Sequence, residues 1–378
     1  MFIVKTMKVI FLVGPLGKAY RDTYNDTVKI TSKRPWLQVV PKTKWLNEDG
    51  TIRGKRDHVR IDYAAAYATK WLLQKYRKDV DFKIVTPTVL TKQMINKSDL
   101  VIHHWYDKLT MPPIKALSTK TAPNSKYQKM IDTAGGDKMF PPIKYQHLVY
   151  DKCAYYKFFR ERGINTAPTV CISRKEYNAK KASVINKIWS KAQEWKEMFG
   201  KPVHGTDSGD VGRPWDFENK MGVQKYMANV FSSPNRYPAI VFQKFMVDFE
   251  LNFPQIRLYY LGDKYHHSIV EWKTPYPNGT SRLSKPSDAK FLSKAKTFAK
   301  KVLKAVSPFY KGAPKYLTRI DVGCCIQEGK IKPSSLFLNE IEVLAGAYLF
   351  YDGERRLNFD YKLGQQAVKV IEHFRKKI

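Results

Sequence analysis

Two glutamates with one residue between them, Glu340 and Glu342, stand in an otherwise apolar run from Leu336 to Leu344. The run is typical of a buried β-strand. Alternate side chains of a strand share one face, so both carboxylates point the same way. Two carboxylates side by side near a core repel one another and lose hydration. The pattern therefore predicts a positive charge that lies between them.

A third acid is expected at the same site. The strand predicted just before the pair, Leu317 to Cys325, contains Asp321 flanked by Arg319. Antiparallel pairing across a turn at Gly329 brings Asp321 beside the two glutamates. Three carboxylates that converge on one face of two neighbouring strands form a site of hard oxygen ligands, which suits Mg²⁺ and is poor for zinc. In the alternative, Asp321 and Glu340 are ordinary strand acids that pair with Arg319 and a lysine.

A magnesium site of this kind predicts a nucleoside triphosphate, because Mg²⁺ held by few carboxylates completes its shell with water and phosphate oxygens. The sequence has no Walker A motif and no Rossmann glycine fingerprint. It has instead a short loop with Gly205, Ser208, Gly209 and Gly212 after Lys201. The backbone N–H groups of such a loop can cover phosphates, with the lysine as a point charge. The alternative is a plain turn.

The length and composition indicate a folded globular protein. At 378 residues the chain has room for two or three domains, and its apolar content is 43%. The four cysteines (Cys153, Cys171, Cys324 and Cys325) have no CxxC spacing and predict no disulfide framework, which suits a reducing compartment. We therefore expect an intracellular, cytoplasmic-like location. The apolar stretch Val9–Val13 is too short for a membrane span and predicts a first strand.

The charge is strongly positive, with 67 Lys+Arg against 34 Asp+Glu and a net charge of +33. Such a field attracts polyanions, including nucleic acid, although a solvated lysine-rich surface is the alternative. The candidate patch is the lysine-rich face 285–315, where Asp288 is the only acid. It contains a predicted amphipathic helix, Ala289 to Val306, with four lysines on its outer side: Lys290, Lys294, Lys301 and Lys304.

The order of elements predicts two parts. Strands at 7–13, 81–87 and 99–107 with a helix at 57–77 indicate an N-terminal α/β domain, 1–145, which ends in a connector at about 111–145. The second part, 146–378, has mixed elements: helices at 152–162 and 176–199, a strand at 238–247, and a hairpin at 255–273 that turns at Gly262–Asp263.

Six short motifs follow one another in this second part. They are a "DK" helix that ends in "GINTAP" (151–168), "GKPVHGTDSGDVG" (200–212), "VFQKF" (241–245), "QIR" (255–257), "RID" (319–321) and "NEIE" (339–342). In this order the chain resembles the ATP-grasp superfamily from roughly Tyr150 to Glu372. The resemblance implies an α/β N-terminal substrate domain joined to an α+β ATP-grasp fold, in which a lid subdomain (168–245) and a central and C-terminal subdomain (246–378) clamp ATP.

The resemblance also implies roles for individual residues. Those on the nucleotide side are phosphate binding by Lys152, Lys201, Ser208 and Gly209, adenine recognition by the hinge Gln243, Lys244 and Phe245, and ribose binding by Glu250. Arg257 and Arg319 would steady the transferred phosphoryl group or the acyl phosphate. Asp321, Glu340 and Glu342 would bind Mg²⁺, with Mn²⁺ as a substitute. The family commonly has Asn at the position of Glu342, and the added charge either tightens metal binding or marks altered chemistry.

The resemblance implies an ATP-dependent ligase that activates a carboxylate as an acyl phosphate and joins it to an amine, thiol or similar nucleophile. The motifs look nearer to the branch that modifies peptides and proteins, and the substrate would be a small molecule, a peptide or a protein. The alternative is a non-catalytic basic protein that kept the fold and binds nucleic acid or serves structurally, for example packaged in a virus particle. The adjacent histidines His266 and His267 are rejected as metal ligands, because neighbours on a strand face opposite ways.

Overall fold

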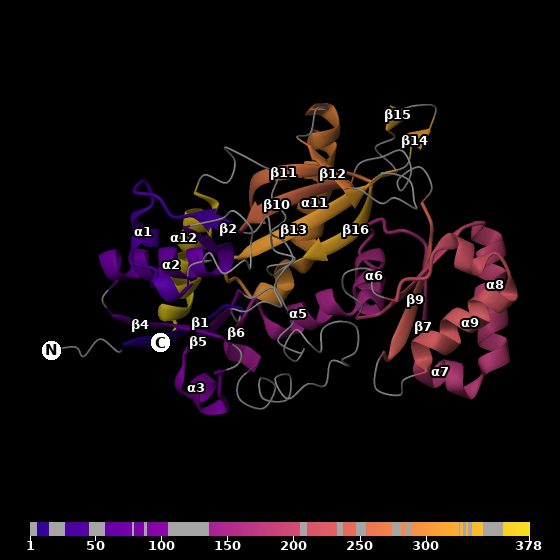
Figure 1. Ribbon diagram of the computed structural model, residues 1–378, viewed down its shortest axis with the longest axis horizontal. Helices are drawn as coiled ribbons and strands as arrows, with labels where there is room; N and C mark the ends of the chain where they lie inside the picture. The colour runs from indigo at the N-terminus through magenta and orange to yellow at the C-terminus, as the bar shows by residue number, and fades with distance from the viewer. Residues whose placement is uncertain are drawn as a thin grey trace.

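The computed structural model describes residues 6–14, 27–44, 57–77, 79–86, 89–104, 136–204, 210–232, 237–246, 255–273, 281–284, 289–324, 326–327, 330–331, 335–342 and 358–378. They form three regions along the long axis of the molecule (Figure 1). An N-terminal α/β region lies at one end. A five-stranded central sheet lies in the middle, and a three-stranded distal sheet with its own helices lies at the other end.

The N-terminal region is built on a parallel sheet of order β4-β1-β5-β6, as the α/β prediction expected. Its strands are β1 (Met7–Leu12), β4 (Val80–Val85), β5 (Leu100–His103) and β6 (Met139–Phe140). The helices of this region are α1 (Pro35–Gln38), α2 (Ile61–Tyr76) and α3 (Lys92–Lys97). The helix predicted from Asp57 starts later, at Ile61, because His58–Arg60 forms β3 and pairs with β2 (Thr27–Lys29).

The C-terminal helix α12 (Phe359–Arg375) packs on α2 and so returns the chain to the N-terminal region (Figure 1). A small-residue contact lets the two helices approach closely. A Cβ added at Gly364 would lie 2.8 Å from Cβ of Ala68 and 2.9 Å from the backbone N of Thr69. Glycine is therefore needed for the close approach of these helices.

The central sheet is antiparallel, in the order β12-β11-β10-β13-β16. Its strands are β10 (Gln255–Leu261), β11 (Lys264–Lys273), β12 (Ser281–Ser284), β13 (Leu317–Gly323) and β16 (Phe337–Glu342), and α11 (Ala289–Val306) packs on β10 and β13. The predicted hairpin is confirmed, with Gly262 at a φ of +65 in its turn. The predicted pairing of β13 with β16 is also confirmed, and a small hairpin, β14 (Ile326–Gln327) with β15 (Lys330–Ile331), lies between them in sequence.

The distal sheet has the order β7-β9-β8, with strands β7 (Thr169–Ser173), β8 (Met198–Pro202) and β9 (Ala239–Lys244). The helices α7 (Arg174–Ala179), α8 (Lys181–Trp195) and α9 (Lys220–Phe231) lie with it (Figure 1). The single helix predicted over 176–199 is wrong. The helix breaks at Lys180 (φ −141, ψ 48), and Lys196 adopts a left-handed φ of 65. Phe199 lies in β8, because that segment pairs with β9.

Two helices connect the regions, α5 (Ile143–Tyr150) and α6 (Lys152–Arg160). Asp151 caps α6 as predicted: its Oδ1 accepts a hydrogen bond of 2.8 Å from the N–H of Ala154. A disulfide joins Cys153 of α6 to Cys171 of β7 and corrects the prediction that the cysteines form none. The two Cα atoms lie 5.9 Å apart although 18 positions separate them, a proximity that linear spacing does not reveal.

None of the helices described is long and apolar enough to span a membrane. The predicted domain limits at 145, 168 and 245 stay predictions.

Candidate functional site

A row of charged side chains crosses the central sheet where the sequence predicted converging carboxylates. Arg257 of β10 lies opposite Asp321 of β13, and Asp321 lies opposite Glu340 of β16. Arg319 and Glu342 form the next row. Residues two apart on a strand share a face, so all five residues belong to one face of the sheet.

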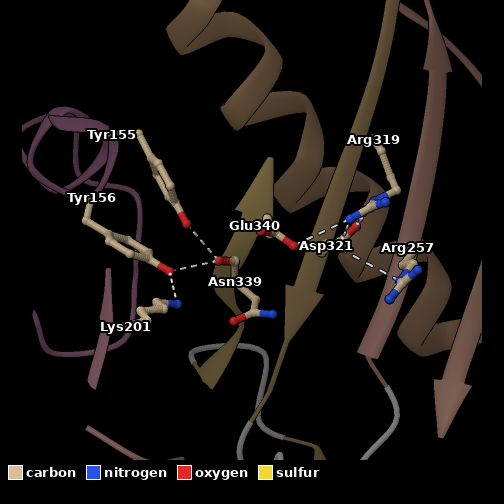
Figure 2. Close-up of polar contacts among 8 residues, drawn as sticks. All are labelled: Tyr155, Tyr156, Lys201, Arg257, Arg319, Asp321, Asn339 and Glu340. Atoms are coloured by element: carbon tan, nitrogen blue, oxygen red, sulfur yellow. Dashed lines mark hydrogen bonds and ion pairs between the residues drawn. The ribbon is translucent and has the colours of Figure 1, made fainter. Parts of the chain in front are cut away.

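The positive charge predicted beside the glutamates is the guanidinium of Arg319. Its Nε and one terminal nitrogen each donate a 2.8 Å hydrogen bond to a different oxygen of Asp321 (Figure 2). The same terminal nitrogen lies 3.5 Å from Oε2 of Glu340, and Nε of Arg257 lies 3.8 Å from Oδ2 of Asp321. Arg319 therefore bridges two of the three predicted metal ligands.

The members of this cluster differ in exposure and in protonation. Asp321 is fully buried, whereas the Glu340 side chain keeps 37% of its surface exposed. Burial raises the pKa of Asp321, opposed by Arg319 and Arg257. Loss of water also acts to raise the pKa of Glu340, but attraction to Arg319, Lys152 and Lys201 outweighs it and lowers that pKa. Burial acts to lower the pKa of Arg319, but Asp321 outweighs it and the pKa rises well above its usual value.

The two predicted phosphate lysines come from different elements and face the acidic row. Lys152 begins α6 and Lys201 lies in β8, and both lower the pKa of Glu340. Nζ of Lys201 donates a 3.1 Å hydrogen bond to the hydroxyl of Tyr156 and lies 5.4 Å from the centre of that ring. A cation held against an aromatic face and a hydroxyl has a restricted position. The structure thus brings both lysines to the edge of the central sheet at β16.

Two tyrosines that the motifs did not predict join α6 to β16. The hydroxyls of Tyr155 and Tyr156 donate to the backbone carbonyl of Asn339, at 3.2 and 3.1 Å (Figure 2). Asn339 directly precedes Glu340, so this contact fixes the strand at the acidic row. The only sequence signal was a pair of adjacent aromatic residues three positions after the "DK" lysine. Such a pair is also typical of an ordinary core helix.

The predicted hinge lies where β9 ends. Gln243 is buried; its Nε2 donates to Oγ1 of Thr169 at 3.1 Å, and the Tyr156 hydroxyl lies 3.5 Å from its Oε1. The backbone N–H groups of Lys244 and Phe245 donate to the carbonyls of Pro168 and Glu197, at 2.9 and 3.0 Å. These bonds hold the hinge against β7 and β8, and adenine recognition there stays a prediction.

The two ends of the predicted phosphate loop are paired and closely packed. Gly200 and Gly212 exchange backbone hydrogen bonds of 3.0 and 2.7 Å across the two ends of the loop. A Cβ added at Gly200 would lie 2.5 Å from a ring carbon of Tyr226 and 2.8 Å from one of Phe217. Glycine is therefore required at position 200, where the loop begins. Ser208 and Gly209, and also the predicted ribose ligand Glu250, lie outside the described residues.

The argument that neighbouring histidines face opposite ways fails at His266 and His267. Their Nδ1 atoms lie 2.6 Å apart, and both rings pack on Phe359 of α12. The cause is a β-bulge, which shifts the register between Tyr259 and Tyr260 and breaks the alternation of faces. The reason for rejecting this pair as metal ligands is therefore wrong, and the rejection itself stays a prediction. Within the part of the chain that the structure describes, no three His, Cys, Asp or Glu residues cluster so as to hold a metal ion.

No protein-family model and no curated protein matches the chain in sequence. Solved structures match over nearly its whole length. D-cycloserine synthetase DcsG matches with a TM-score of 0.60 and 12% identity, covering 97% of this chain and 99% of that one. A D-alanine–D-alanine ligase from Bacillus anthracis complexed with ATP matches with a TM-score of 0.53 and 11% identity, covering 99% of this chain and 99% of that one. The ATP-grasp ligase PsnB complexed with minimal precursor matches with a TM-score of 0.51 and 10% identity, covering 96% of this chain and 98% of that one.

The fold is the ATP-grasp fold. The fold expected from six short motifs is therefore confirmed, including an α/β region ahead of the ATP-grasp part. In this chain, charged side chains from five elements meet at one site: the acids of β13 and β16, the lysines of α6 and β8, and the arginines of β10 and β13.

The ATP-grasp fold implies a divalent metal, and the donor chemistry fits one. Asp321 and Glu340 are paired across the strands and offer carboxylate oxygens, the ligands that Mg²⁺ prefers. In this structure both oxygens of Asp321 accept hydrogen bonds from Arg319. Glu342 lies opposite Arg319 and not opposite Asp321. Metal binding by these residues stays a prediction.

Proposed function

We propose that this protein is an ATP-dependent ligase that activates a carboxylate as an acyl phosphate and joins it to an amine or similar nucleophile. The observation that supports the proposal best is the convergence of two lysines and two arginines on an acidic row. Lys152 and Lys201 act on Glu340 from one side, and Arg319 and Arg257 act on Asp321 from the other. Alternating positive and negative charges at one site suit a metal-bound triphosphate.

The residues are of the kind that phosphoryl transfer requires. This reaction depends mainly on positioning and on neutralising the charge of the phosphoryl oxygens, and it needs no protein nucleophile. In the proposal, Lys152 and Lys201 hold the phosphates of ATP, and Tyr156 fixes the direction of the Lys201 ammonium. Arg319 and Arg257 bind oxygens of the transferred phosphoryl group or of the acyl phosphate. The loop that starts from the Gly200–Gly212 pair covers the phosphates and excludes water.

Asp321 and Glu340 would hold Mg²⁺, with Mn²⁺ as a substitute, and the ion would supply further neutralisation of phosphate charge. Glu342, where the family commonly has Asn, is proposed to add negative charge beside Arg319. That charge keeps Arg319 protonated, since Glu342 is among the groups that raise its pKa. The carboxylate substrate is a small molecule, a peptide or a protein.

Binding of ATP is the first test. The thermal unfolding midpoint is measured with and without Mg²⁺ and ATP, for the wild type and for Glu340→Ala. A ligand that binds only the folded state stabilises it by RT ln(1 + [L]/Kd), or about 2.7 kcal/mol at a hundredfold excess over Kd. We expect a rise of the unfolding midpoint in the wild type that needs both Mg²⁺ and ATP, and no rise in Glu340→Ala.

The matched control is Glu161→Ala, which removes an exposed carboxylate on the C-terminal side of α6 and should keep the rise. No rise in the wild type would contradict the proposal.

One observation favours a second candidate function, contact with the phosphate backbone of nucleic acid. Helix α11 has six lysines and no acidic residue among its 18 residues. Its apolar side, with Phe291 and Ala295, is buried, while Lys290, Lys301 and Lys304 are exposed. From Lys290 to Lys304 the lysines extend over about 21 Å, at the 1.5 Å rise per residue of an α-helix. A charged stripe of this length is complementary to a polyanionic strand.

This candidate is tested by the salt dependence of binding to a fluorescent DNA duplex. Replacing Lys290, Lys294, Lys301 and Lys304 by Glu should weaken binding and flatten the slope of log K against log salt. The control replaces four exposed lysines of the distal region, Lys175, Lys180, Lys220 and Lys225, in the same way. Equal losses in both variants would show that net charge alone attracts DNA and would contradict a role for α11.

A further inference from the structure

The disulfide between Cys153 and Cys171 joins the two elements that carry the proposed phosphate lysines. Cys153 follows Lys152 directly on α6. Cys171 of β7 lies opposite Val241 of β9, and Val241 lies opposite Lys201 of β8. Residues directly opposite one another on neighbouring strands share a face, so Cys171 and Lys201 lie on one face of the distal sheet, about 10 Å apart. Each cysteine is therefore a near neighbour of one lysine.

The face of the distal sheet that bears Cys171 and Lys201 is the face that α6 covers. Val241, which lies between them, packs in the same core cluster as Tyr156 of α6. Phe242, one residue further along β9, packs instead in the cluster that contains residues of α8 and α9. The disulfide therefore crosses the interface between α6 and the distal sheet, on the side of the sheet where the nucleotide is proposed to bind.

Hydrogen bonds cross the same interface. The backbone N–H of Lys152 donates to the carbonyl of Val203 at 3.3 Å, and the ammonium of Lys201 donates to the hydroxyl of Tyr156 at 3.1 Å. Such bonds exchange for bonds to water and hold an interface less firmly than a covalent bond does. Both lysines act on Glu340, and as two like charges near one another they repel. We therefore expect the interface to loosen at the lysines when the disulfide is absent.

A triphosphate that is held by both lysines requires them at one fixed spacing. A protein that already has this spacing loses less conformational entropy when the ligand binds. The disulfide supplies the spacing in advance, because it ties the backbone next to Lys152 to the strand row of Lys201. Cys153 and Cys171 are both partly exposed, so a thiol from solution can reach the bond.

We propose that the Cys153–Cys171 disulfide is a redox lock on the nucleotide site: the oxidised protein holds Lys152 and Lys201 at the spacing that binds the phosphates of ATP, and reduction releases α6 from the distal sheet and weakens ATP binding. This inference rests on the proposed function. It adds a way in which the thiol–disulfide balance of the surroundings controls the site.

The reductant is a thiol. One thiolate of the reductant attacks one sulfur of the disulfide and forms a mixed disulfide, and a second thiol group of the reductant then displaces the cysteine from it. The products are two cysteine thiols in the protein and one disulfide of the reductant. Two electrons and two protons thus pass to the protein.

The test is the dissociation constant for ATP with Mg²⁺, measured by titration calorimetry on the same wild-type protein after oxidation with glutathione disulfide and after reduction with dithiothreitol. Mass spectrometry after alkylation of free thiols establishes which form is present. We expect about threefold to tenfold weaker binding after reduction, the cost of ordering one long side chain on binding. Reoxidation should restore the affinity. Equal or tighter binding after reduction would overturn the inference.

Two sets of variants assign the effect to this pair of cysteines. Cys153→Ser and Cys171→Ser should each bind ATP as weakly as the reduced wild type and should not respond to dithiothreitol. The matched control replaces the other two cysteines of the chain, Cys324→Ala with Cys325→Ala, and should keep the full response. Loss of the response in this control would place the effect at other thiols and would contradict the lock.

Reciprocity gives a second measurement. If the disulfide tightens ATP binding by a given factor, ATP has to favour formation of the disulfide by the same factor. The fraction of oxidised protein is measured in glutathione buffers of graded composition, with and without ATP and Mg²⁺. A tenfold factor corresponds to a shift of about 30 mV in the reduction potential. A midpoint that does not move with ATP would contradict the coupling even if reduction weakened binding.

The same titrations distinguish failure of this inference from failure of the proposed function. If the oxidised and reduced proteins bind ATP with equal affinity, the ligase proposal stands and the lock is wrong. If neither form binds ATP, both are wrong.

Discussion

Lys201 of β8 donates a 3.1 Å hydrogen bond to the hydroxyl of Tyr156 on α6, and that hydroxyl in turn donates to the carbonyl of Asn339 on β16. Three elements that are far apart in sequence thus meet through one side-chain oxygen. The chain of contacts sets the distance between a predicted phosphate lysine and the acidic row.

Tyr156→Phe should therefore weaken ATP binding about three- to tenfold while the protein stays folded, because a single hydrogen bond is worth about 0.5–1.5 kcal/mol. Lys201→Ala should weaken it further, because it removes the charge. The dissociation constant for ATP with Mg²⁺ is measured by titration calorimetry. Tyr177→Phe, which removes a hydroxyl from the helix layer of the distal sheet, is the control and leaves ATP binding unchanged. Unchanged affinity in Tyr156→Phe would separate Tyr156 from the nucleotide site.

Gly200 should not tolerate a side chain. The Cβ of Gly200→Ala would lie 2.5 Å from Tyr226 and 2.8 Å from Phe217, so those rings have to shift. Overpacking of this kind costs about 1–3 kcal/mol. We expect that loss in the free energy of unfolding, measured with urea. Since the closest contact is with Tyr226, the same change in a Tyr226→Leu background should cost clearly less. An equal cost in both backgrounds would place the strain elsewhere.

The acidic row was predictable because two strong local rules apply there. A strand has a period of two, which puts Glu340 and Glu342 on one face, and a short connection makes β13 and β16 antiparallel neighbours, which brings Asp321 to Glu340. The helix Ala289–Val306 was predicted with its observed bounds, because its apolar and lysine faces are cleanly separated. In both cases the information lies within one continuous segment of the chain.

The remaining features depend on contacts between distant residues. The disulfide of Cys153 and Cys171 needs α6 to lie on β7, and the contact of His266 with His267 needs a bulge that pairing creates. The sequence predicted a positive charge between the glutamates. A metal ion and an arginine satisfy that requirement equally well, and only the packed side chains identify Arg319.

The protein should lose stability as the pH falls from about 6.5 to about 4. Burial, aided by repulsion from Lys362, lowers the pKa of His266 from 6.5 to about 4. Between these values the unfolded chain binds a proton at this residue and the folded protein does not, so acid favours unfolding. In His266→Asn the fall over this window should be smaller. Chemical denaturation at pH 7 and at pH 5 measures it for both proteins. A steeper fall in the variant would contradict the assignment.

A buried hydrogen bond ties the C-terminal helix α12 to α1 of the N-terminal region. The indole N–H of Trp36 donates a 2.6 Å hydrogen bond to Oδ2 of Asp360, and both residues are buried. Burial raises the pKa of Asp360, and the hydrogen bond from Trp36 opposes that rise. Trp36→Phe removes the donor and leaves a buried carboxylate less well satisfied, which should cost about 1–3 kcal/mol of unfolding free energy near neutral pH.

The matched control is Trp71→Phe. Trp71 packs in the same cluster, with ring centres 6.4 Å from Trp36 and 6.3 Å from Tyr361, and its replacement leaves the Asp360 hydrogen bond in place. The pH dependence separates the hydrogen bond from lost packing. As the pH falls through the folded pKa of Asp360, the carboxyl takes up a proton and needs the indole donor less, so the deficit of Trp36→Phe should shrink relative to that of Trp71→Phe. Urea denaturation at several pH values measures the loss of unfolding free energy in each variant. If the two losses change equally with pH, Trp36 stabilises α12 through packing alone and its bond to Asp360 adds nothing.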